Sequence, residues 1–128
     1  MENLGISVLL VDDDEGLRNT VYNWLSQMGL RVEVAATGLH AIQKLKINPV
    51  VSVVVSDVKM PGMNGLNMVK KFREEVPEFK GPVILMSGHA SADDIRTAKN
   101  LGAYAFLVKP FKPQDLFDKI RQAAAAAT

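Results

Sequence analysis

Short apolar runs alternate along the chain with segments whose apolar residues recur at helical spacing. The runs around residues 8–11, 50–56 and 82–86 are almost continuously apolar. Strands that are buried on both faces have this composition, because helices cover both sides of their sheet. The pattern predicts five strands, at residues 6–11, 31–35, 50–56, 82–86 and 104–108.

Five amphipathic helices are predicted after these strands, and most carry start or stop signals. Gly29 follows the first helix at the position where a glycine commonly ends one. The second helix begins near Thr37 and ends before Asn48-Pro49, the third ends before Pro77, and the fourth runs from Ser91 to Gly102. Pro113 lies in the first turn of the fifth helix. The expected apolar faces contain Leu17, Val21, Trp24, Leu25 and Met28; Leu39, Ile42 and Leu45; Leu66, Val69 and Phe72; and Leu116, Phe117 and Ile120.

This order predicts the α/β fold class. Right-handed crossovers turn a (βα)5 order into a doubly wound, five-stranded parallel sheet with helices on both faces. The chain has 128 residues, which suits one domain with a single core. We expect residues 1–122 to form that domain, and the Ala-rich residues 123–128 to end the last helix or to begin a linker.

Composition narrows the possible functions only a little. The chain is 48% hydrophobic and 23% charged, as in ordinary soluble globular proteins. It has no Cys, which excludes disulfides, thiolate metal sites and a Cys nucleophile and suits a cytoplasmic protein. No apolar run reaches the ~18 residues of a membrane span. The net charge of +1 excludes neither nucleic acid nor protein partners. No Lys/Arg-rich block marks a phosphate-backbone contact, and we expect no direct binding to nucleic acid or membrane.

Charged and hydroxyl side chains follow four of the five predicted strands. Asp12 and Asp13 follow the first, Asp57 the third, Ser87 the fourth and Lys109 the fifth. Ligands of open α/β sheets bind beyond the carboxyl ends of the strands, so these side chains are expected at one edge. The second strand brings no charged group there. This fits a sheet in which the second strand is the outer edge and the first and third strands lie side by side.

Converging carboxylates repel one another unless a cation neutralises them. The candidate ligands of Asp12, Asp13 and Asp57 are hard oxygens, which favour Mg²⁺ where few protein ligands leave room for water. A hydroxyl at Ser87 and an ammonium at Lys109 would complete a site for a phosphoryl group. Because a carboxylate is already a nucleophile, the matching reaction is phosphoryl transfer to Asp57.

Four segments together resemble the receiver domain of two-component response regulators, and the resemblance covers essentially the whole chain. The segments are VLLVDDDE, VSDVKMPGMNG, ILMSGHA and GAYAFLVKPF. The resemblance implies a flavodoxin-like strand order of 2-1-3-4-5. It also implies that a histidine kinase or a phosphotransfer protein donates a phosphoryl group to Asp57, and that the domain is a phosphoacceptor switch rather than a turnover enzyme.

The resemblance assigns further roles by position. Asp12, Asp13, Asp57 and the backbone carbonyl of Lys59 would hold Mg²⁺, Asp13 directly and Asp12 largely through water. Ser87 and Lys109 would contact the phosphoryl group. Phe106 occupies the position of the switch aromatic but lacks a tyrosine hydroxyl, and Ser87 keeps the hydroxyl at a position where threonine is equally common. The bond between Lys109 and Pro110 is expected to be cis. Lys59 and His89 border the site, where the family tunes phosphate lifetime.

The resemblance also implies an output. Phosphorylation would draw Ser87 toward the new charge, and Phe106 would follow into the vacated space. The surface formed by the fourth helix, fifth strand and fifth helix would then change. That surface would control a downstream effector protein or a C-terminal output domain, in a monomer or a phosphorylation-dependent dimer.

Several features also have a purely structural interpretation. Asp14 is better explained as a helix N-cap than as a metal ligand. The histidines His40 and His89 are not expected to bind metal or phosphate. Phe106 fits a core position as well as a switch position, and Trp24 is expected to be wholly or partly buried. Four methionines are expected to pack in the core and loops: Met60, Met63, Met68 and Met86.

Three alternative functions compete with the switch. A haloacid-dehalogenase-like phosphatase would carry its nucleophile in Asp-x-Asp after the first strand, whereas Asp57 follows the third. A flavodoxin-type flavin module would have a loop rich in Ser, Thr and Gly where this chain has three aspartates. A degenerate receiver acting only as an adaptor would not need the intact set of Asp12, Asp13, Asp57, Ser87 and Lys109.

Overall fold

Five parallel strands form one sheet in the order β2-β1-β3-β4-β5. The computed structural model describes residues 4–60, 62–88 and 91–127. The strand order confirms the predicted sheet, because β2 lies at an edge and β1 lies beside β3. The strands are β1 (Ser7–Val11), β2 (Arg31–Ala35), β3 (Val53–Asp57), β4 (Val83–Ser87) and β5 (Ala105–Val108).

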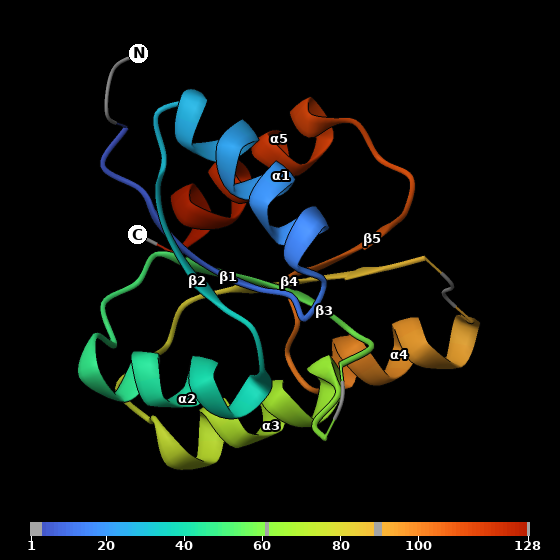
Figure 1. The fold of residues 1–128 in the computed structure, drawn as a ribbon. Coiled ribbons are helices and arrows are strands. Elements are labelled where there is room, and N and C mark those ends of the chain that lie inside the picture. Colours follow the sequence, from blue (N-terminus) through green and yellow to red (C-terminus); the bar gives the residue numbers. More distant parts are fainter. Residues whose placement is uncertain (1–3, 61, 89–90, 128) are drawn as a thin grey trace.

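Helices cover both faces of the sheet (Figure 1). One face carries α1 and α5, and the other carries α2, α3 and α4. This arrangement confirms the doubly wound α/β class. The helices are α1 (Glu15–Gln27), α2 (Gly38–Ile47), α3 (Gly65–Glu75), α4 (Ala92–Asn100) and α5 (Pro113–Ala126). No helix in the described part of the chain is long and apolar enough to cross a membrane.

The strands divide their side chains between two cores. Val8 and Leu10 pack with α1 and α5, whereas Leu9 and Val11 pack with the helices of the opposite face. Alternation along β3 and β4 follows the same period of two, as a strand covered on both sides requires. The almost unbroken apolar runs in the sequence therefore contribute side chains to both cores, and this packing holds the strands in place.

The helix ends follow the predicted signals. Asp14 caps α1 by accepting a hydrogen bond from the Leu17 backbone N–H at 3.0 Å, which confirms its structural interpretation. Thr37 and Ser91 cap α2 and α4 in the same way. Gly29 has φ of 92°, in the left-handed region that glycine adopts without strain, directly after α1.

Two details of the sequence prediction were wrong. The third strand begins at Val53 rather than at residue 50, because Val50 follows Pro49 in a turn and is 81% exposed. Leu39 is 60% exposed, because the buried side of α2 runs through Ala41, Ile42 and Leu45 and Leu39 lies to one side of it. Neither change alters the frame of the sheet.

Candidate functional site

The strand register brings the predicted polar residues to one edge of the sheet. Val11 of β1 pairs with Ser56 of β3, so the next residues, Asp12 and Asp57, come side by side. Ser87 is the last residue of β4 and is buried, and the N–H of Lys109 donates to its carbonyl oxygen at 2.8 Å. The carboxyl ends of β1, β3, β4 and β5 thus meet in one site, as the sequence predicted.

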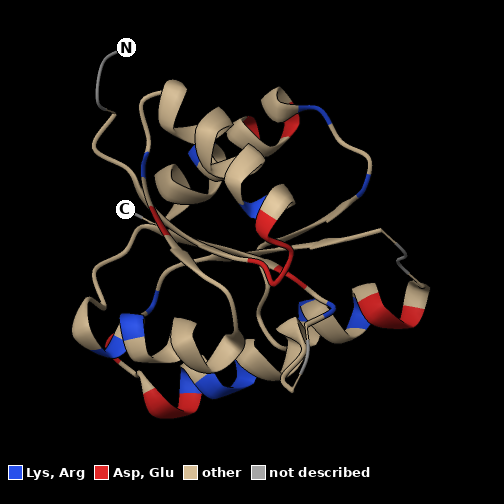
Figure 2. Ribbon diagram, in the orientation of Figure 1, with Lys and Arg blue, Asp and Glu red and all other residues tan. Residues whose placement is uncertain are grey.

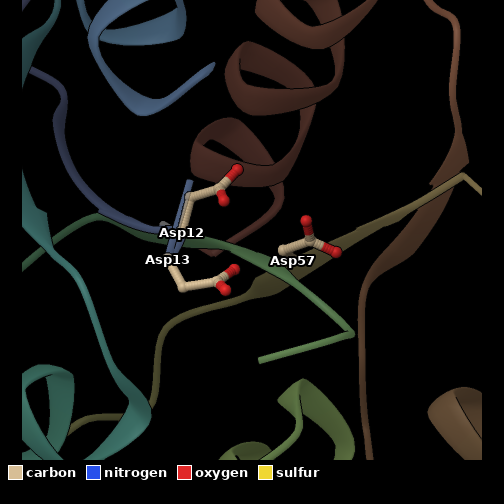
Figure 3. Close-up of side chains that lie close together, drawn as sticks. All are labelled: Asp12, Asp13 and Asp57. Carbon is tan, nitrogen blue, oxygen red and sulfur yellow. The ribbon is translucent and has the colours of Figure 1, made fainter. Parts of the chain in front are cut away.

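Three carboxylates converge in this site. One oxygen from each of Asp12, Asp13 and Asp57 lies within 4.8 Å of the other two. Figure 3 shows the side chains of Asp12 and Asp13 reaching from the end of β1 toward the side chain of Asp57 at the end of β3. In Figure 2, the ribbon at this end of the sheet is red, the colour of Asp and Glu. Like charges so close together favour the binding of a cation.

Asp57 has a defined contact at each carboxylate oxygen. The Lys109 ammonium donates to Oδ2 at 2.9 Å, and the Lys59 backbone N–H donates to Oδ1 at 3.2 Å. The side chain of Asp57 is 14% exposed and that of Lys109 is 24% exposed, so the pair is largely buried but still reached by solvent. The carboxylate is therefore oriented, charge-compensated and still accessible.

Asp12 is completely buried, and all but one of its polar atoms have partners. Its N–H donates to the Ala35 carbonyl at 3.1 Å, and its Oδ1 accepts from the Asp14 N–H at 2.9 Å. Its own carbonyl accepts from Arg18 Nη1 at 2.9 Å. Oδ2 has no hydrogen-bond partner, and within the described residues it is the only buried side-chain oxygen or nitrogen in that condition.

Burial raises the pKa of the Asp12 carboxyl above its ordinary value of 3.8. The hydrogen bond from the Asp14 backbone N–H lowers this pKa, while the negative charge of Asp57 raises it further. To a smaller extent, the positive charge of Lys109 lowers this pKa and the negative charge of neighbouring Asp13 raises it. The largest cause is therefore the removal of the carboxylate from water, which disfavours its charged form.

The donor set fits a hard divalent cation. Asp12 Oδ2 is a buried oxygen without a partner, and Asp13 is an exposed carboxylate beside it. The available ligands are carboxylate oxygens, the type that Mg²⁺ and Ca²⁺ prefer. Lys59 borders the site on an open pocket that Asp13, Met60 and Asn64 also line.

The remaining predicted residues are arranged around this centre. Phe106 lies on β5 opposite Leu85 and is partly buried against the core on the α2–α4 face. The peptide bond between Lys109 and Pro110 is cis. His40 is exposed in the first turn of α2, and His89 lies outside the described residues.

Arg18 is a residue that the sequence pattern did not single out. It lies on α1, where the sequence pattern predicts only an ordinary polar position of an amphipathic helix. Its side chain nevertheless contacts the backbone of residues 12–14, which we call the acidic loop. Only the packing of α1 against the end of β1 reveals that contact. No sequence signal marks it, because the partner is a backbone carbonyl rather than a side chain.

Comparison with known proteins gives a consistent result. The family model described as response regulator receiver domain matches residues 8–121. Chemotaxis protein CheY1 of Helicobacter pylori is 35% identical over 116 residues, which cover 90% of this chain and 94% of that protein. The C4-dicarboxylate transport transcriptional regulatory protein DctD of Pseudomonas aeruginosa is also 35% identical over 116 residues, covering 91% of this chain but 24% of that protein. The structure of chemotaxis protein CheY4 of Vibrio cholerae has a TM-score of 0.86 and 34% identity, with 92% and 98% coverage.

Proposed function

This chain belongs to the response regulator receiver domain family of two-component systems, and from that premise we propose that Asp57 accepts a phosphoryl group with Mg²⁺ bound beside it. The observation that carries the proposal is the paired state of Asp57. One of its oxygens contacts the Lys109 ammonium at 2.9 Å, and its carboxylate shares a 4.8 Å cluster with Asp12 and Asp13. Such a site combines a nucleophile with the positive charge that a phosphoryl group requires.

In the proposed reaction, a carboxylate oxygen of Asp57 attacks the phosphorus atom of the donor. A new O–P bond forms while the bond between phosphorus and the donor's leaving atom breaks, and the leaving group departs with the bonding electrons. The Lys109 ammonium, which contacts Asp57, would then form an ion pair with a phosphoryl oxygen, and the Ser87 hydroxyl would donate a hydrogen bond to another phosphoryl oxygen. Bound Mg²⁺ would supply further positive charge to the phosphoryl oxygens.

Asp12 and Asp13 are the proposed side-chain ligands of the metal, together with Asp57 and the backbone carbonyl of Lys59. The orphaned Oδ2 of Asp12 supports this choice, because a buried anionic oxygen without a partner is stabilised when a cation arrives. Mg²⁺ keeps several waters, which suits a site whose other side is open at Asp13 and Lys59.

The proposed output is a change of the surface formed by α4, β5 and α5. Ser87 would move toward the phosphoryl group, and Phe106, one strand away on β5, would follow it into the core. The half-buried state of Phe106 supports a position between two arrangements. The domain would act as a phosphoacceptor switch that is not a turnover enzyme.

The partners in this proposal are a histidine kinase or phosphotransfer protein as donor and an effector as receiver of the signal. Relatives of two sizes support two forms of output: CheY1 is matched over 94% of its length, and DctD over 24%. The effector is accordingly a separate protein or a further domain, and the receiver acts in the cytoplasm as a monomer or as a phosphorylation-dependent dimer. We assign residues 1–122 to the receiver unit and 123–128 to the end of the last helix or a linker.

Intact-mass measurement after addition of acetyl phosphate and Mg²⁺ tests the proposal. The chain and the variant Asp118→Ala, which loses an exposed carboxylate on α5, should each gain one phosphate. Asp57→Ala should gain none, and omission of Mg²⁺ should prevent the gain in the other two proteins. A folded wild-type protein that takes no phosphate in Mg²⁺ would contradict the proposal and favour a role as an unphosphorylated adaptor.

A further inference from the structure

We propose that Arg18 is a positioning residue of the metal site, acting through the backbone carbonyl of Asp12. This inference rests on the proposed function, because it concerns the cation that the acidic cluster would hold. Arg18 Nη1 donates to the Asp12 carbonyl oxygen at 2.9 Å, and the contact is partly buried. Arg18 would not touch the cation or the phosphoryl group.

The contact completes the fixation of Asp12. Hydrogen bonds to Ala35 and from Asp14 already hold its N–H and its Oδ1. With the carbonyl bound to Arg18, Oδ2 is the only polar atom of Asp12 that has no hydrogen bond. That remaining oxygen belongs to the carboxylate of the acidic cluster. Three fixed points on one residue leave Asp12 little freedom to turn its carboxylate away from a cation.

Arg18 and the acidic loop also hold each other in place through the start of α1. The Arg18 backbone N–H donates to the Asp14 carbonyl at 2.8 Å, and Asp14 in turn caps the helix through its side chain. The side chain of Arg18 then returns to the loop one residue before Asp13. The Arg18 guanidinium therefore ties the backbone at Asp12, the residue before Asp13, to α1, in addition to the link that the Asp14 cap provides. Outer partners of this kind orient metal ligands.

Charge and position predict opposite effects when Arg18 is removed. The positive charge of Arg18, which contacts the Asp12 backbone, would repel a cation bound at the acidic cluster, so loss of that charge alone would strengthen Mg²⁺ binding. Loss of the hydrogen bond would free the Asp12 carbonyl and loosen the ligands, which would weaken Mg²⁺ binding. The sign of the change therefore separates a positioning role from a purely electrostatic one.

Calorimetric titration with Mg²⁺ tests the inference on the wild-type chain and on Arg18→Ala, Arg18→Gln and Arg18→Lys. We expect Arg18→Ala to bind Mg²⁺ roughly tenfold more weakly, the lower end of what outer-partner substitutions cause. Glutamine and lysine retain a donor and should recover part of that loss. Arg96→Ala is the matched control, because Arg96 is exposed and pairs only with exposed Asp93 among the described contacts. It should bind Mg²⁺ like the wild type.

Unchanged or tighter Mg²⁺ binding by Arg18→Ala would overturn the inference while leaving the metal site intact. Equal weakening in Arg18→Ala, Arg18→Gln and Arg18→Lys would also overturn it, since a retained donor would then make no difference. Thermal unfolding in EDTA establishes that each variant is folded, and Arg18→Lys carries the test if the alanine variant is not. Absence of binding by the wild type would instead overturn the proposed metal site, and this inference with it.

Discussion

The two ends of the adjacent strands β1 and β3 carry polar side chains in opposite conditions. At the amino end, Ser7 and Ser52 satisfy each other: each backbone N–H donates to the other's hydroxyl, at 3.0 and 3.1 Å, and the hydroxyls lie 3.3 Å apart. At the carboxyl end, Asp12 and Asp57 belong to a cluster of like charges, and one Asp12 oxygen has no partner.

This contrast separates stability from function on a shared pair of strands. A closed hydrogen-bonded pair contributes to the folded state and has nothing left to offer a ligand. A cluster of under-compensated carboxylates destabilises the protein alone and gains free energy when a cation or a phosphoryl group arrives. The predictions below test whether the two ends behave in these opposite ways.

Substitution of Lys109 should produce the largest effect, and it should act on the reaction. Lys109→Met removes the ammonium 2.9 Å from Asp57 and should slow phosphorylation by acetyl phosphate about 100-fold, as expected when a preorganised charge contact is lost. Lys112→Met is the matched control, because Lys112 is exposed in the loop that follows and its described hydrogen bonds are made by its backbone N–H and carbonyl. Rates within threefold of each other for the two variants would remove Lys109 from the reaction.

Close packing behind Asp57 should produce the next largest effect. A Cβ on Gly65 would lie 2.6 Å from the Asp57 carbonyl oxygen and 3.0 Å from the Cα of Val58. Gly65→Ala should therefore destabilise the fold by about 2 kcal/mol and slow phosphorylation, since Asp57 must shift. Gly88→Ala is the control, because its Cβ would meet nothing within 4 Å. Equal urea midpoints for the two variants would show that the approach of α3 to Asp57 is not tight.

The amino end should respond as a purely structural pair. Ser52→Ala leaves the Ser7 N–H without its acceptor and should lower the free energy of unfolding by about 1.5 kcal/mol, with no change in phosphorylation. The double variant of Ser7 and Ser52 to alanine should cost less than the sum of the single ones, because each single change strands the other partner. Thr20→Ala, which removes an exposed hydroxyl from α1, should have little effect. Additive losses at Ser7 and Ser52 would mean that the serines act independently.

The sequence predicted what depends on local pattern and on strand register. Asp12, Asp57, Ser87 and Lys109 each lie at the carboxyl end of a strand, and parallel order alone brings such residues to one edge. The exposure of Leu39 depends on which side of α2 packs against the sheet, and the start of β3 depends on the turn at residues 49–50. Apolar composition does not encode either, so both predictions were wrong. The hydrogen-bond partners of the site residues could not be predicted from the sequence either. The orphaned Oδ2 of Asp12 and the Arg18 contact depend on distances between elements that no spacing in the chain encodes.

The smallest expected effect is a gain of stability at the carboxyl end. Asp12→Asn keeps an acceptor for the Asp14 N–H and removes a buried charge, so in EDTA it should raise the free energy of unfolding at neutral pH by about 1 kcal/mol. The pKa of Asp12 is raised in the folded protein, so the folded state retains a proton that the unfolded state releases. Wild-type stability should consequently fall as pH rises from the ordinary value of 3.8 through the raised pKa. The advantage of the variant should vanish below that window.

Urea unfolding followed through Trp24 fluorescence measures both the gain and its pH dependence. Mg²⁺ should reverse the order at neutral pH: at ten times its dissociation constant, it would stabilise the wild type by about 1.4 kcal/mol and the variant by much less. A variant less stable than the wild type in EDTA would mean that Asp12 is compensated within the protein. The carboxyl end would then resemble the serine pair at the other end of β1 and β3, and the orphaned oxygen would have no energetic consequence.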